Sequence, residues 1–313
     1  MQFQEKYKTY FQYIDKEIKS LKTFQAVPLF YDPIHYVLDL PGKKIRPLMV
    51  MLSCGIAGGE TIKAAPAAAA VELLHNFTLV HDDIMDNDET RRGKPSVHAK
   101  WDVNTAILAG DGLLGFAFQK LLQTDIQARG LLADRFTEAM IIICEGQGLD
   151  KMFEEQQSIT ADEYLDMISR KTAALIQLSC ELGAIIADAD QMEIKQLHDF
   201  GFNLGMGFQV QDDILDITAD QDTLGKKVGS DFEMQKQTVL SIKLRQKIGR
   251  DKFDSLDLNS YTKLLKNEGI LDEVGALAEN YFSAARQNLN DFAASEHKRL
   301  MLEIVDDIQH RTW

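Results

Sequence analysis

Apolar residues along most of the chain recur at steps of three and four positions, which is the spacing of one buried helix face. The clearest run lies between Ala161 and Ala187. Its apolar positions are Tyr164, Leu165, Ile168, Leu175, Leu178, Leu182 and Ile185. The segments Gln191 to Asp216 and Leu271 to Phe292 repeat the spacing. No stretch alternates apolar and polar residues as a half-buried strand does, so the pattern predicts helices and little or no sheet.

Proline is confined to the first third of the chain, which leaves the rest without the strongest helix breaker. The six prolines are Pro28, Pro33, Pro41, Pro47, Pro66 and Pro95. We expect about ten or more helices, with loops near residues 27–41, 87–95, 124–130 and 220–229. No linker or repeat divides the sequence. The expected fold class is therefore all-α: a large single-domain helical bundle, residues 1–313, around a central active-site cavity.

The chain is strongly acidic, with 48 Asp and Glu against 34 Lys and Arg and a formal net charge of −14. A protein that binds nucleic acid usually presents a basic face, so nucleic acid is not an expected partner. An acidic chain also repels anionic ligands. A diphosphate or similar ligand would therefore need a bridging cation.

Cys54, Cys144 and Cys180 are odd in number and far apart, with neither disulfide nor zinc spacing. They fit a reducing compartment, and we expect the protein to be cytoplasmic. The N-terminal residues 1–20 carry charges every few positions, unlike a signal peptide. No run of about 18 uncharged apolar residues predicts a membrane span.

A first acidic cluster, Asp82-Asp83-Ile84-Met85-Asp86, ends the apolar run of residues 67–80. Asp82 and Asp86 are four positions apart, so on a helix they share a face with Cβ atoms about 6 Å apart. Like charges at that spacing destabilise a helix unless something compensates them. Taken alone, the cluster is equally consistent with a solvated acidic helix end.

A second cluster, containing Asp212, Asp213 and Asp216, repeats the DDxxD spacing at the end of another apolar helical run. Acids among apolar residues face a cavity or pair with cations more often than they face water. Two such clusters make solvated helix ends the less favoured interpretation. If the helices face each other, their carboxylates would form a set of hard oxygen ligands suited to magnesium, which also takes substrate phosphates as ligands.

Four basic sites lie beside these clusters. They are Gly42–Pro47 (GKKIRP), Thr90–Pro95 (TRRGKP), Lys171 with Thr172, and Gly225–Gly229 (GKKVG) followed by Lys236. Arginine forks suit phosphate oxygens, and lysine acts as a point charge. Each site alone is more often a solvated surface feature. Together with the acids, they indicate two anionic groups, one held through metal and one held by cations directly.

These elements, in this order, resemble the trans-prenyl diphosphate synthases, or polyprenyl synthetases. The resemblance spans Leu40 to Thr238. Its motifs are GKKIRP, ELLH leading into HDDIMD, DETRRGKPSVH, KT, and GFQVQDDILD followed by GKKVGSD. The resemblance implies an all-α fold of the isoprenoid synthase type, generally a homodimer. It also implies that the single domain is one prenyl diphosphate synthase domain.

The resemblance also implies roles for individual residues. Magnesium, about three ions per active site bound with the allylic diphosphate, would be held by Asp82, Asp86, Asp212 and Asp216. Asp83, Asp213 and Lys171 would complete the catalytic set. The residues contacting the allylic diphosphate would be Arg91, Lys171, Thr172, Gln209, Lys226 and Lys236. The residues holding isopentenyl diphosphate without metal would be Gly42, Lys43, Arg46, His75 and Arg92.

One segment departs from the family pattern. Asp231–Thr238 (DFEMQKQT) lacks the acid-Gly-Lys sequence and the following proline that are common in the family. The resemblance therefore supports a family role for Lys226 more strongly than for Lys236. His81 is equally consistent with a core histidine.

The implied reaction joins an allylic diphosphate (dimethylallyl, geranyl or farnesyl) head-to-tail to isopentenyl diphosphate, with loss of a proton. For product length, Thr78, Leu74 and Val71 lie within a quarter turn of Asp82 on a helical wheel. Phe77 lies farther round, but in the family a bulky aromatic there is associated with short products. Phe77 beside Thr78, with no insertion in DDIMD, resembles geranylgeranyl diphosphate synthases and suggests a C20 product. Farnesyl diphosphate, a longer polyprenyl product, and Phe77 as plain core packing remain open.

Two other classes remain as alternatives. A class I terpene cyclase shares an aspartate-rich helix and magnesium, but its second metal motif normally has an Asn/Ser/Glu pattern. A non-catalytic subunit of a heteromeric synthase tends to lose one aspartate motif. This chain retains both motifs, which favours the synthase.

Overall fold

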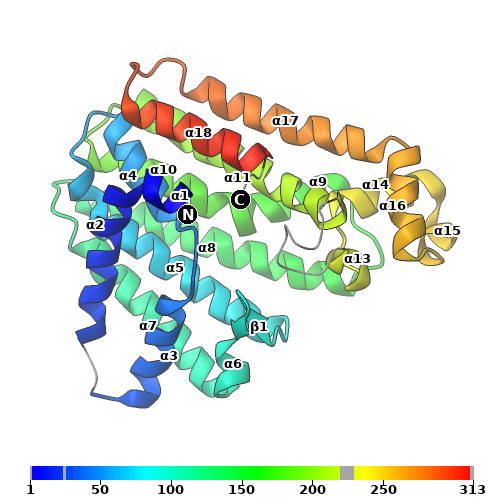
Figure 1. Ribbon diagram of the computed structural model, residues 1–313, viewed down its shortest axis with the longest axis horizontal. Coiled ribbons are helices and arrows are strands. Elements are labelled where there is room, and N and C mark those ends of the chain that lie inside the picture. The colour runs from blue at the N-terminus through cyan, green and yellow to red at the C-terminus, as the bar shows by residue number, and fades with distance from the viewer. Residues whose placement is uncertain (1, 24–25, 219–228, 311–313) are drawn as a thin grey trace. The chain divides into compact units, whose positions relative to one another are not determined.

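The computed structural model describes residues 2–23, 26–218 and 229–310, and within them the protein is almost entirely helical (Figure 1). The strands of the described residues form one short antiparallel hairpin, β1 (Thr90–Arg91) and β2 (Lys94–Pro95). The predicted all-α fold class is confirmed.

The chain divides into two compact units. The first comprises Met1–Met140 and Leu178–Leu197, and the second Ile141–Gln177 and His198–Trp313. The boundaries fall within three helices: α8 (Arg129–Glu155), α10 (Ala174–Ile186) and α11 (Gln191–Thr218). The other helices of the first unit are α1 (Gln2–Lys6), α2 (Lys8–Lys19), α3 (Pro28–Asp39), α4 (Ile45–Ile56), α5 (Ala65–Met85), α6 (Val97–Lys100) and α7 (Val103–Leu122), with 3-10 turns at Ser20–Thr23 and Thr61–Ala64.

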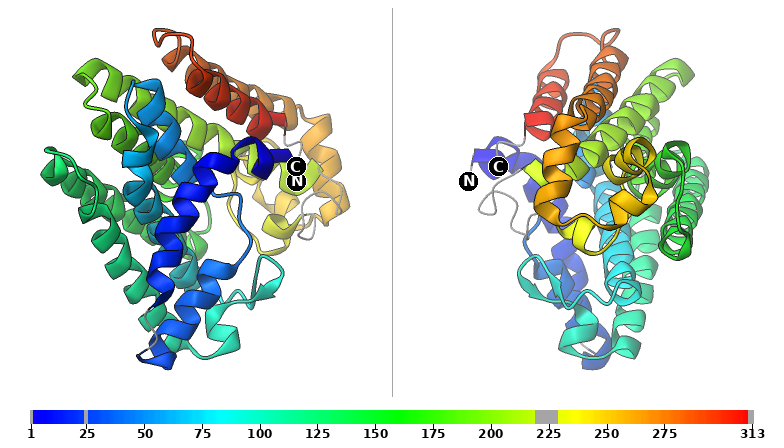
Figure 2. Two further views of the ribbon diagram at one scale, coloured as in Figure 1. Left: turned by 60° about the vertical axis from the view of Figure 1, so that its left-hand side comes forward. Right: turned by 90° about the vertical axis from the view of Figure 1, so that its right-hand side faces the viewer.

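After the last part of α8, the second unit contains α9 (Ala161–Ile168), which continues through a π-helical turn, Ser169–Ala173, into α10. Its remaining helices are α13 (Ser230–Glu233), α14 (Val239–Ile248), α15 (Arg250–Asp254), α16 (Leu258–Asn267), α17 (Ile270–Asn288) and α18 (Glu296–His310). Helices α17 and α18, orange and red, run side by side in Figures 1 and 2.

Helix α5 is the core helix of the first unit. Residues 67–71 are fully buried, and the helix packs most extensively against α7. A glycine makes this contact possible: a Cβ on Gly110 of α7 would lie 2.2 Å from Nε2 of His81. Pro66 stands in the first turn of α5, where its missing N–H costs no hydrogen bond. These features explain why an Ala-rich segment forms the long helix that carries the first acidic cluster.

Side-chain caps fix several helix starts. The Asp102 carboxylate accepts from the backbone N–H of Thr105 at the start of α7. Thr160 and Glu163 form a reciprocal capping box at the start of α9. Each cap satisfies backbone donors that would otherwise lack a partner.

The prediction of a loop at residues 27–41 is wrong, because α3 spans Pro28–Asp39. Pro28 lies in the first turn, where proline is tolerated. Pro33 lies inside the helix and is buried with Ile34 and Val37. Packing of this apolar face against α7 overrides the break that proline would otherwise cause. The expected loop at 87–95 is the turn that contains the hairpin, and most of residues 124–130 precede α8. Apart from Gly229, the expected loop at 220–229 lies outside the described residues.

One described helix, α7, is long and apolar enough to cross a membrane by length and composition. Within the first unit it packs against α5 and α3 and buries Ala106, Ala109 and Leu113. A core helix of a globular unit has the same composition. This packing accounts for the buried part of the apolar sequence of α7.

Candidate active site

The first acidic cluster lies at the C-terminal end of α5, and Asp86 is the residue that caps it. Asp82 and Asp86 are half-buried, whereas Asp83 is only 3% exposed. A helix C-terminus carries partial negative charge, so carboxylates are unfavourable there unless a cation is close. The location of Asp82 and Asp86 is therefore costly for the bare fold and fits a cation-binding role.

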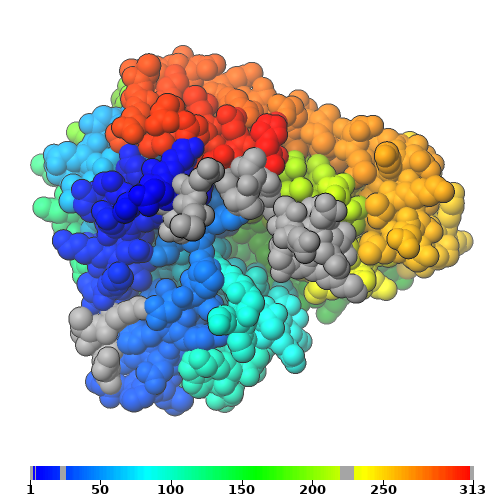
Figure 3. Space-filling model, in the orientation of Figure 1, coloured from blue at the N-terminus to red at the C-terminus, as the bar shows by residue number. Residues whose placement is uncertain are grey.

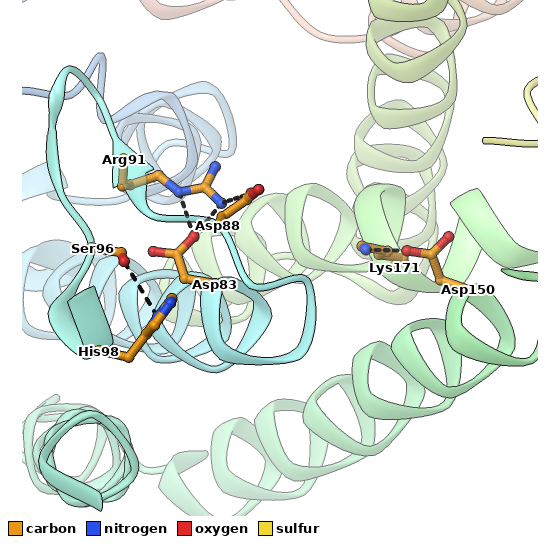
Figure 4. A network of polar contacts seen from close by, with 7 residues as sticks. All are labelled: Asp83, Asp88, Arg91, Ser96, His98, Asp150 and Lys171. Carbon is orange, nitrogen blue, oxygen red and sulfur yellow. Dashed lines mark hydrogen bonds and ion pairs between the residues drawn. The ribbon is translucent and has the colours of Figure 1, made fainter. Parts of the chain in front are cut away.

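Asp83 has a cationic partner in the chain itself. Arg91 of β1 donates from Nε to Oδ1 of Asp83 at 2.8 Å and from Nη2 to the same oxygen. Its Nη2 also lies 3.3 Å from Oδ2 of Asp88 (Figure 4). Burial raises the pKa of Asp83, and the bonds from Arg91 oppose that shift. Arg91, expected to contact the allylic diphosphate, therefore also joins the hairpin to the end of α5.

The turn of the hairpin presents Arg92. Thr90 pairs with Pro95 and Arg91 with Lys94, so Arg92 and Gly93 form the turn, with φ of 54° and 72°. A left-handed non-glycine residue is strained by about 1 kcal/mol or more. The Arg92 guanidinium lies against Gly42, where a Cβ would come within 2.9 Å of Nη1. Figure 3 shows the cyan segment around the hairpin at the surface.

A second charged cluster is formed by the half-buried Arg46 of α4 with the buried Glu72 and the half-buried His75 of α5. Arg46 Nη1 and His75 Nε2 are 3.3 Å apart, and Glu72 is 3% exposed. Asn76 donates to the Glu72 carbonyl oxygen at 2.7 Å. Burial lowers the pKa of Arg46 to about 10. It also lowers the pKa of His75 well below its usual value, aided by the charges of Arg46 and Arg92.

This part of the first unit brings together most of the residues expected to bind isopentenyl diphosphate. Arg46 contacts His75, and Arg92 contacts Gly42. Lys43, the residue after Gly42, is exposed. The buried Nε of Arg46 has no hydrogen-bond partner among the described residues. Buried donors are normally satisfied, so this orphaned donor supports an anionic ligand here.

A small pocket lies next to the cluster, under the hairpin. It is lined by Tyr36, Val37, Leu40, Asn76, Leu79, Val80, Asp83, Arg91, Arg92, Pro95, Ser96 and Val97. The Tyr36 hydroxyl donates to the carbonyl oxygen of Pro95 at 2.7 Å, which ties α3 to the hairpin.

The second acidic cluster lies near the end of α11, in the second unit, and its three carboxylates differ in environment. Asp212 is half-buried, whereas Asp213 and Asp216 are 3% and 1% exposed. The Tyr164 hydroxyl donates to Asp213 Oδ2 at 2.5 Å, and Gln209 Nε2 donates to Oδ1 at 3.1 Å. Burial raises the pKa of Asp213 well above its usual value.

Asp216 is engaged with the chain segment that follows Gly229. Its Oδ1 accepts from the Ser230 hydroxyl at 2.8 Å, and its Oδ2 accepts from the backbone N–H of Asp231 at 3.2 Å. Its carbonyl oxygen accepts from the N–H of Gly229 at 2.7 Å. Each carboxylate oxygen accepts one hydrogen bond and keeps a second lone pair, and hydrogen bonds of this kind orient carboxylates that bind metals.

Lys171 and Thr172 lie in the π-helical turn. The Lys171 ammonium donates to Asp150 of α8 at 2.5 Å (Figure 4). Gly146, one turn earlier on α8, allows this approach, because a Cβ there would lie 2.3 Å from the backbone nitrogen of Lys171. The Thr172 hydroxyl donates to Oε1 of Gln209 at 3.0 Å. π-turns occur frequently at functional sites.

Two other expected diphosphate contacts lie later in the chain. Lys236 is half-buried, and its N–H donates to the carbonyl oxygen of Asp231 at 2.8 Å. Lys226 lies outside the described residues.

The residues expected to set product length lie on α5. Phe77 and Leu74 are buried, and Thr78 is half-buried. The Thr78 hydroxyl donates to the carbonyl oxygen of His75 at 2.8 Å, so it leaves its methyl group for packing. The ring of Phe77 lies 4.7 Å from the ring of His81.

Sequence reasoning missed several residues that the structure ties to the site. Glu72 could have been found, because an acid inside an apolar helical run must have a partner. Gly146 and Asp150 are four positions apart, the spacing of one helix face. Tyr164 gave no signal, since its position fits the apolar periodicity.

The donor chemistry suits a hard cation. The half-buried Asp82, Asp86 and Asp212 offer carboxylate oxygens, which magnesium prefers. Among the described residues, no group of three or more His, Cys, Asp or Glu is gathered at metal-binding distance. The carboxylates of the two clusters belong to different units.

All-α architecture, two DDxxD helix ends and a separate arginine cluster define an enzyme of the prenyltransferase class. A family model for polyprenyl synthetases matches residues 27–270, most of the chain, and the protein belongs to that family. The chain is 42% identical to a geranylgeranyl diphosphate synthase of Sulfolobus acidocaldarius, with 86% of each chain covered. It is 32% identical to a geranylfarnesyl diphosphate synthase of Natronomonas pharaonis, covering 96% of this chain and 95% of that one.

A solved structure agrees with these matches. The geranylgeranyl pyrophosphate synthetase from Pyrococcus horikoshii superposes with a TM-score of 0.93 at 35% identity, covering 99% of this chain and 98% of that one. The fold is therefore the isoprenoid synthase fold that the sequence predicted.

Proposed function

We propose that this prenyltransferase condenses an allylic diphosphate with isopentenyl diphosphate to give geranylgeranyl diphosphate, a C20 product. The observation that carries the proposal is the separation of two kinds of anion site. The half-buried carboxylates Asp82 and Asp86 suit a diphosphate held through a metal. The cluster of Arg46 and Arg92 around His75 suits a second diphosphate held directly.

Magnesium is the metal that fits the donors, with Asp82, Asp86, Asp212 and Asp216 as the ligands that we propose. When bound, it would stabilise the negative charge that builds on the departing diphosphate. We propose about three ions per active site, which would be bound together with the allylic diphosphate. Because Asp82 and Asp212 belong to different units, we propose that the two units act together as one catalytic domain.

The chain's own side chains position the substrates. Lys171, Thr172 and Gln209 form a polar group that can contact the allylic diphosphate. We propose that Arg91, Lys226 and Lys236 also contact the allylic diphosphate. Gly42, Lys43, Arg46, His75 and Arg92 hold the diphosphate of isopentenyl diphosphate.

The reaction needs no nucleophile from the protein. The allylic carbon–oxygen bond breaks, and the isopentenyl double bond supplies the electrons of the new carbon–carbon bond. The proton then lost from the isopentenyl unit goes to the released diphosphate. His75, whose pKa is lowered by burial and by the neighbouring arginines, is a hydrogen-bonding group in this scheme.

A C20 product fits a short prenyl pocket closed by Phe77, with Thr78 and Leu74 beside it. Phe77 is buried on the helix that ends in the first cluster. Both geranylgeranyl and geranylfarnesyl synthases are among the relatives, so a pocket that ends near C20 is consistent with them. Farnesyl diphosphate and longer products are the alternatives.

We further propose a cytoplasmic homodimer. Helix α7 exposes Ile107, Leu108 and Leu122 at 41%, 46% and 50%, and an apolar helix face of this kind is typical of a subunit interface. The cysteines Cys54, Cys144 and Cys180 are free thiols, as in a reducing compartment.

The direct test incubates purified protein with labelled isopentenyl diphosphate, magnesium and each allylic primer in turn, and sizes the products by chromatography. We expect a C20 product. No incorporation with any primer would reject the synthase and favour a non-catalytic subunit. Conversion of the allylic diphosphate alone to a cyclic hydrocarbon would favour a cyclase.

A further inference from the structure

Asp213 and Asp216 of the second cluster are buried, whereas Asp212 is half-buried. Asp213 is buried, and each of its carboxylate oxygens accepts a hydrogen bond from the protein: Oδ2 from Tyr164 at 2.5 Å and Oδ1 from Gln209 at 3.1 Å. A buried carboxylate is stable only when its oxygens are satisfied in this way. The geometry gives Asp213 two internal partners on the side away from solvent.

The hydrogen bonds continue from Asp213 to the π-helical turn. Gln209 donates to Asp213 through its NH₂ group and accepts from the Thr172 hydroxyl at 3.0 Å through its carbonyl oxygen. The Gln209 amide is fixed at both ends, since each of its groups has one chemically matched partner. Tyr164 of α9 and Thr172 therefore both connect to α11 through one pair of side chains, Gln209 and Asp213.

The π-turn depends on such outside support. Its wider hydrogen-bonding pattern is rarer than the α-helical one and usually persists for a reason outside the helix. Two glycines let neighbouring helices approach its backbone. A Cβ on Gly146 would lie 2.3 Å from Lys171 N, and a Cβ on Gly205 would lie 2.5 Å from the Cα of Ala173. Lys171 and Thr172 are thus oriented by contacts on both sides of the turn.

We propose that Tyr164 is a positioning residue that acts through Asp213 to hold Thr172 and Lys171 in the orientation that receives the allylic diphosphate. In this arrangement Asp213 is an internal anchor, whereas Asp212 contacts the metal directly. The identity of the diphosphate rests on the proposed function. The link from Tyr164 to Thr172 rests on the hydrogen bonds through Asp213 and Gln209.

The test compares Tyr164→Phe with Tyr261→Phe. Each change removes one hydroxyl from a buried tyrosine of the second unit, and the hydroxyl of Tyr261 bonds to Thr238 rather than to the aspartate cluster. Binding of a non-reactive thiolo analogue of the allylic diphosphate, in magnesium, is measured by calorimetry beside thermal unfolding and steady-state kinetics. We expect Tyr164→Phe to weaken the analogue's binding roughly ten-fold or more.

The expected pattern separates positioning from stability. Tyr164→Phe should raise the KM for the allylic substrate and leave the KM for isopentenyl diphosphate unchanged, whereas Tyr261→Phe should lower the melting temperature without weakening binding. Equal binding by wild type and Tyr164→Phe overturns the inference, as does an equal loss in both variants. A wild-type protein that does not bind the analogue in magnesium would instead reject the proposed function.

A second pair of variants tests the assignment of Asp213. Asp213→Asn keeps an acceptor for Tyr164, and the Gln209 amide can turn to face the new NH₂ group. Asp212→Asn removes a charge from the proposed metal ligand. We expect Asp213→Asn to weaken analogue binding less than ten-fold with an unchanged magnesium requirement, and Asp212→Asn to raise the magnesium concentration needed for binding. A larger magnesium shift in Asp213→Asn would overturn the anchor assignment.

Discussion

Arg91 donates from its guanidinium Nε to Oδ1 of Asp83 at 2.8 Å and so fastens the hairpin to the end of α5. The same hairpin presents Arg92 to Gly42. The carboxylate next to Asp82 thus serves the protein's own geometry, as the carboxylate next to Asp212 does through Tyr164. In each DDxxD cluster the second aspartate is buried, and in the second cluster Asp216 is buried as well.

Replacement of Arg91 by alanine should therefore lower stability as well as activity. It leaves a nearly buried Asp83 carboxylate without its main donor, which costs about 1–3 kcal/mol. We expect Arg91→Ala to lose that amount in the free energy of unfolding, measured with urea. The double variant Arg91→Ala with Asp83→Asn should lose less than the sum of the single changes. Full additivity in this cycle would show that the pair contributes no coupling.

Replacement of Asp82 or Asp212 by alanine should cripple turnover, since each offers a half-buried carboxylate suited to a metal. Removing one preorganised electrostatic group costs on the order of 10²-fold or more in rate. The measurement is kcat at saturating magnesium and both substrates. Asp134→Ala, which removes an exposed acid of α8, is the control and should turn over normally. Near wild-type rates in Asp82→Ala or Asp212→Ala would contradict the role of both clusters.

Much of the fold could be predicted because its signals are local. Helical periodicity and the absence of proline after Pro95 determine most of the helices. Helix α3 could not be predicted this way, because its stability comes from burying Ile34 and Val37 in contact with the rest of the first unit. That contact is long-range and outweighs the proline at position 33.

The candidate site shows the same difference between local signals, which the sequence reveals, and long-range contacts, which it does not. The aspartates and arginines were found because polar residues in apolar runs are conspicuous. Their pairing was not, since Asp83 with Arg91 and Asp213 with Tyr164 depend on how the helices and the hairpin are arranged. The sequence could not show that the Asp216 carboxylate accepts a hydrogen bond from the backbone N–H of Asp231, which lies 15 positions later.

Arg46→Ala and Arg92→Ala should mainly weaken binding of isopentenyl diphosphate. Both guanidinium groups lie in the cluster around His75. A charge-assisted contact contributes about 1.5–3 kcal/mol, so the KM for isopentenyl diphosphate should rise roughly ten-fold or more. Lys63→Ala, an exposed change on the same unit, is the control. A change only in the KM for the allylic substrate would mean that the two diphosphate sites are reversed.

His75 should make the protein less stable in mild acid. Burial and the charges of Arg46, Arg92 and Arg91 depress its folded-state pKa, and Glu72 is the carboxylate of the same cluster. In the unfolded chain this histidine binds a proton near pH 6.5, whereas in the folded chain it binds one only at lower pH. Stability is therefore lost as pH falls below 6.5, by about 1.4 kcal/mol per pH unit until the folded group titrates.

His75→Gln removes this titration and keeps an acceptor for Arg46. Urea unfolding at pH 7.5 and pH 5.5 should show a smaller acid loss in the variant, by about 1 kcal/mol. The control His310→Gln changes an exposed histidine at the end of α18 and should leave the acid loss unchanged. An identical acid loss in wild type and His75→Gln would show that His75 does not titrate differently on folding.

Phe77→Ala should lengthen the product. Phe77 is buried on α5 five residues before Asp82, and its ring lies against His81, which fits over Gly110. If this ring closes the prenyl pocket, its removal opens a cavity that costs about 3–5 kcal/mol when empty, and a longer tail can fill it. Products of wild type and variant are extracted and sized by chromatography. We expect C20 from wild type and a shift to longer chains in the variant.

Phe136→Ala is the matched control, because Phe136 is fully buried in the same unit and packs on Phe118 at 5.2 Å. It should lose a similar amount of stability with no change in product length, which separates loosened packing from an opened pocket. Longer products from both variants would mean that general loosening sets the length. A folded Phe77→Ala whose products match those of wild type would show that this ring is core packing and that another residue ends the tail.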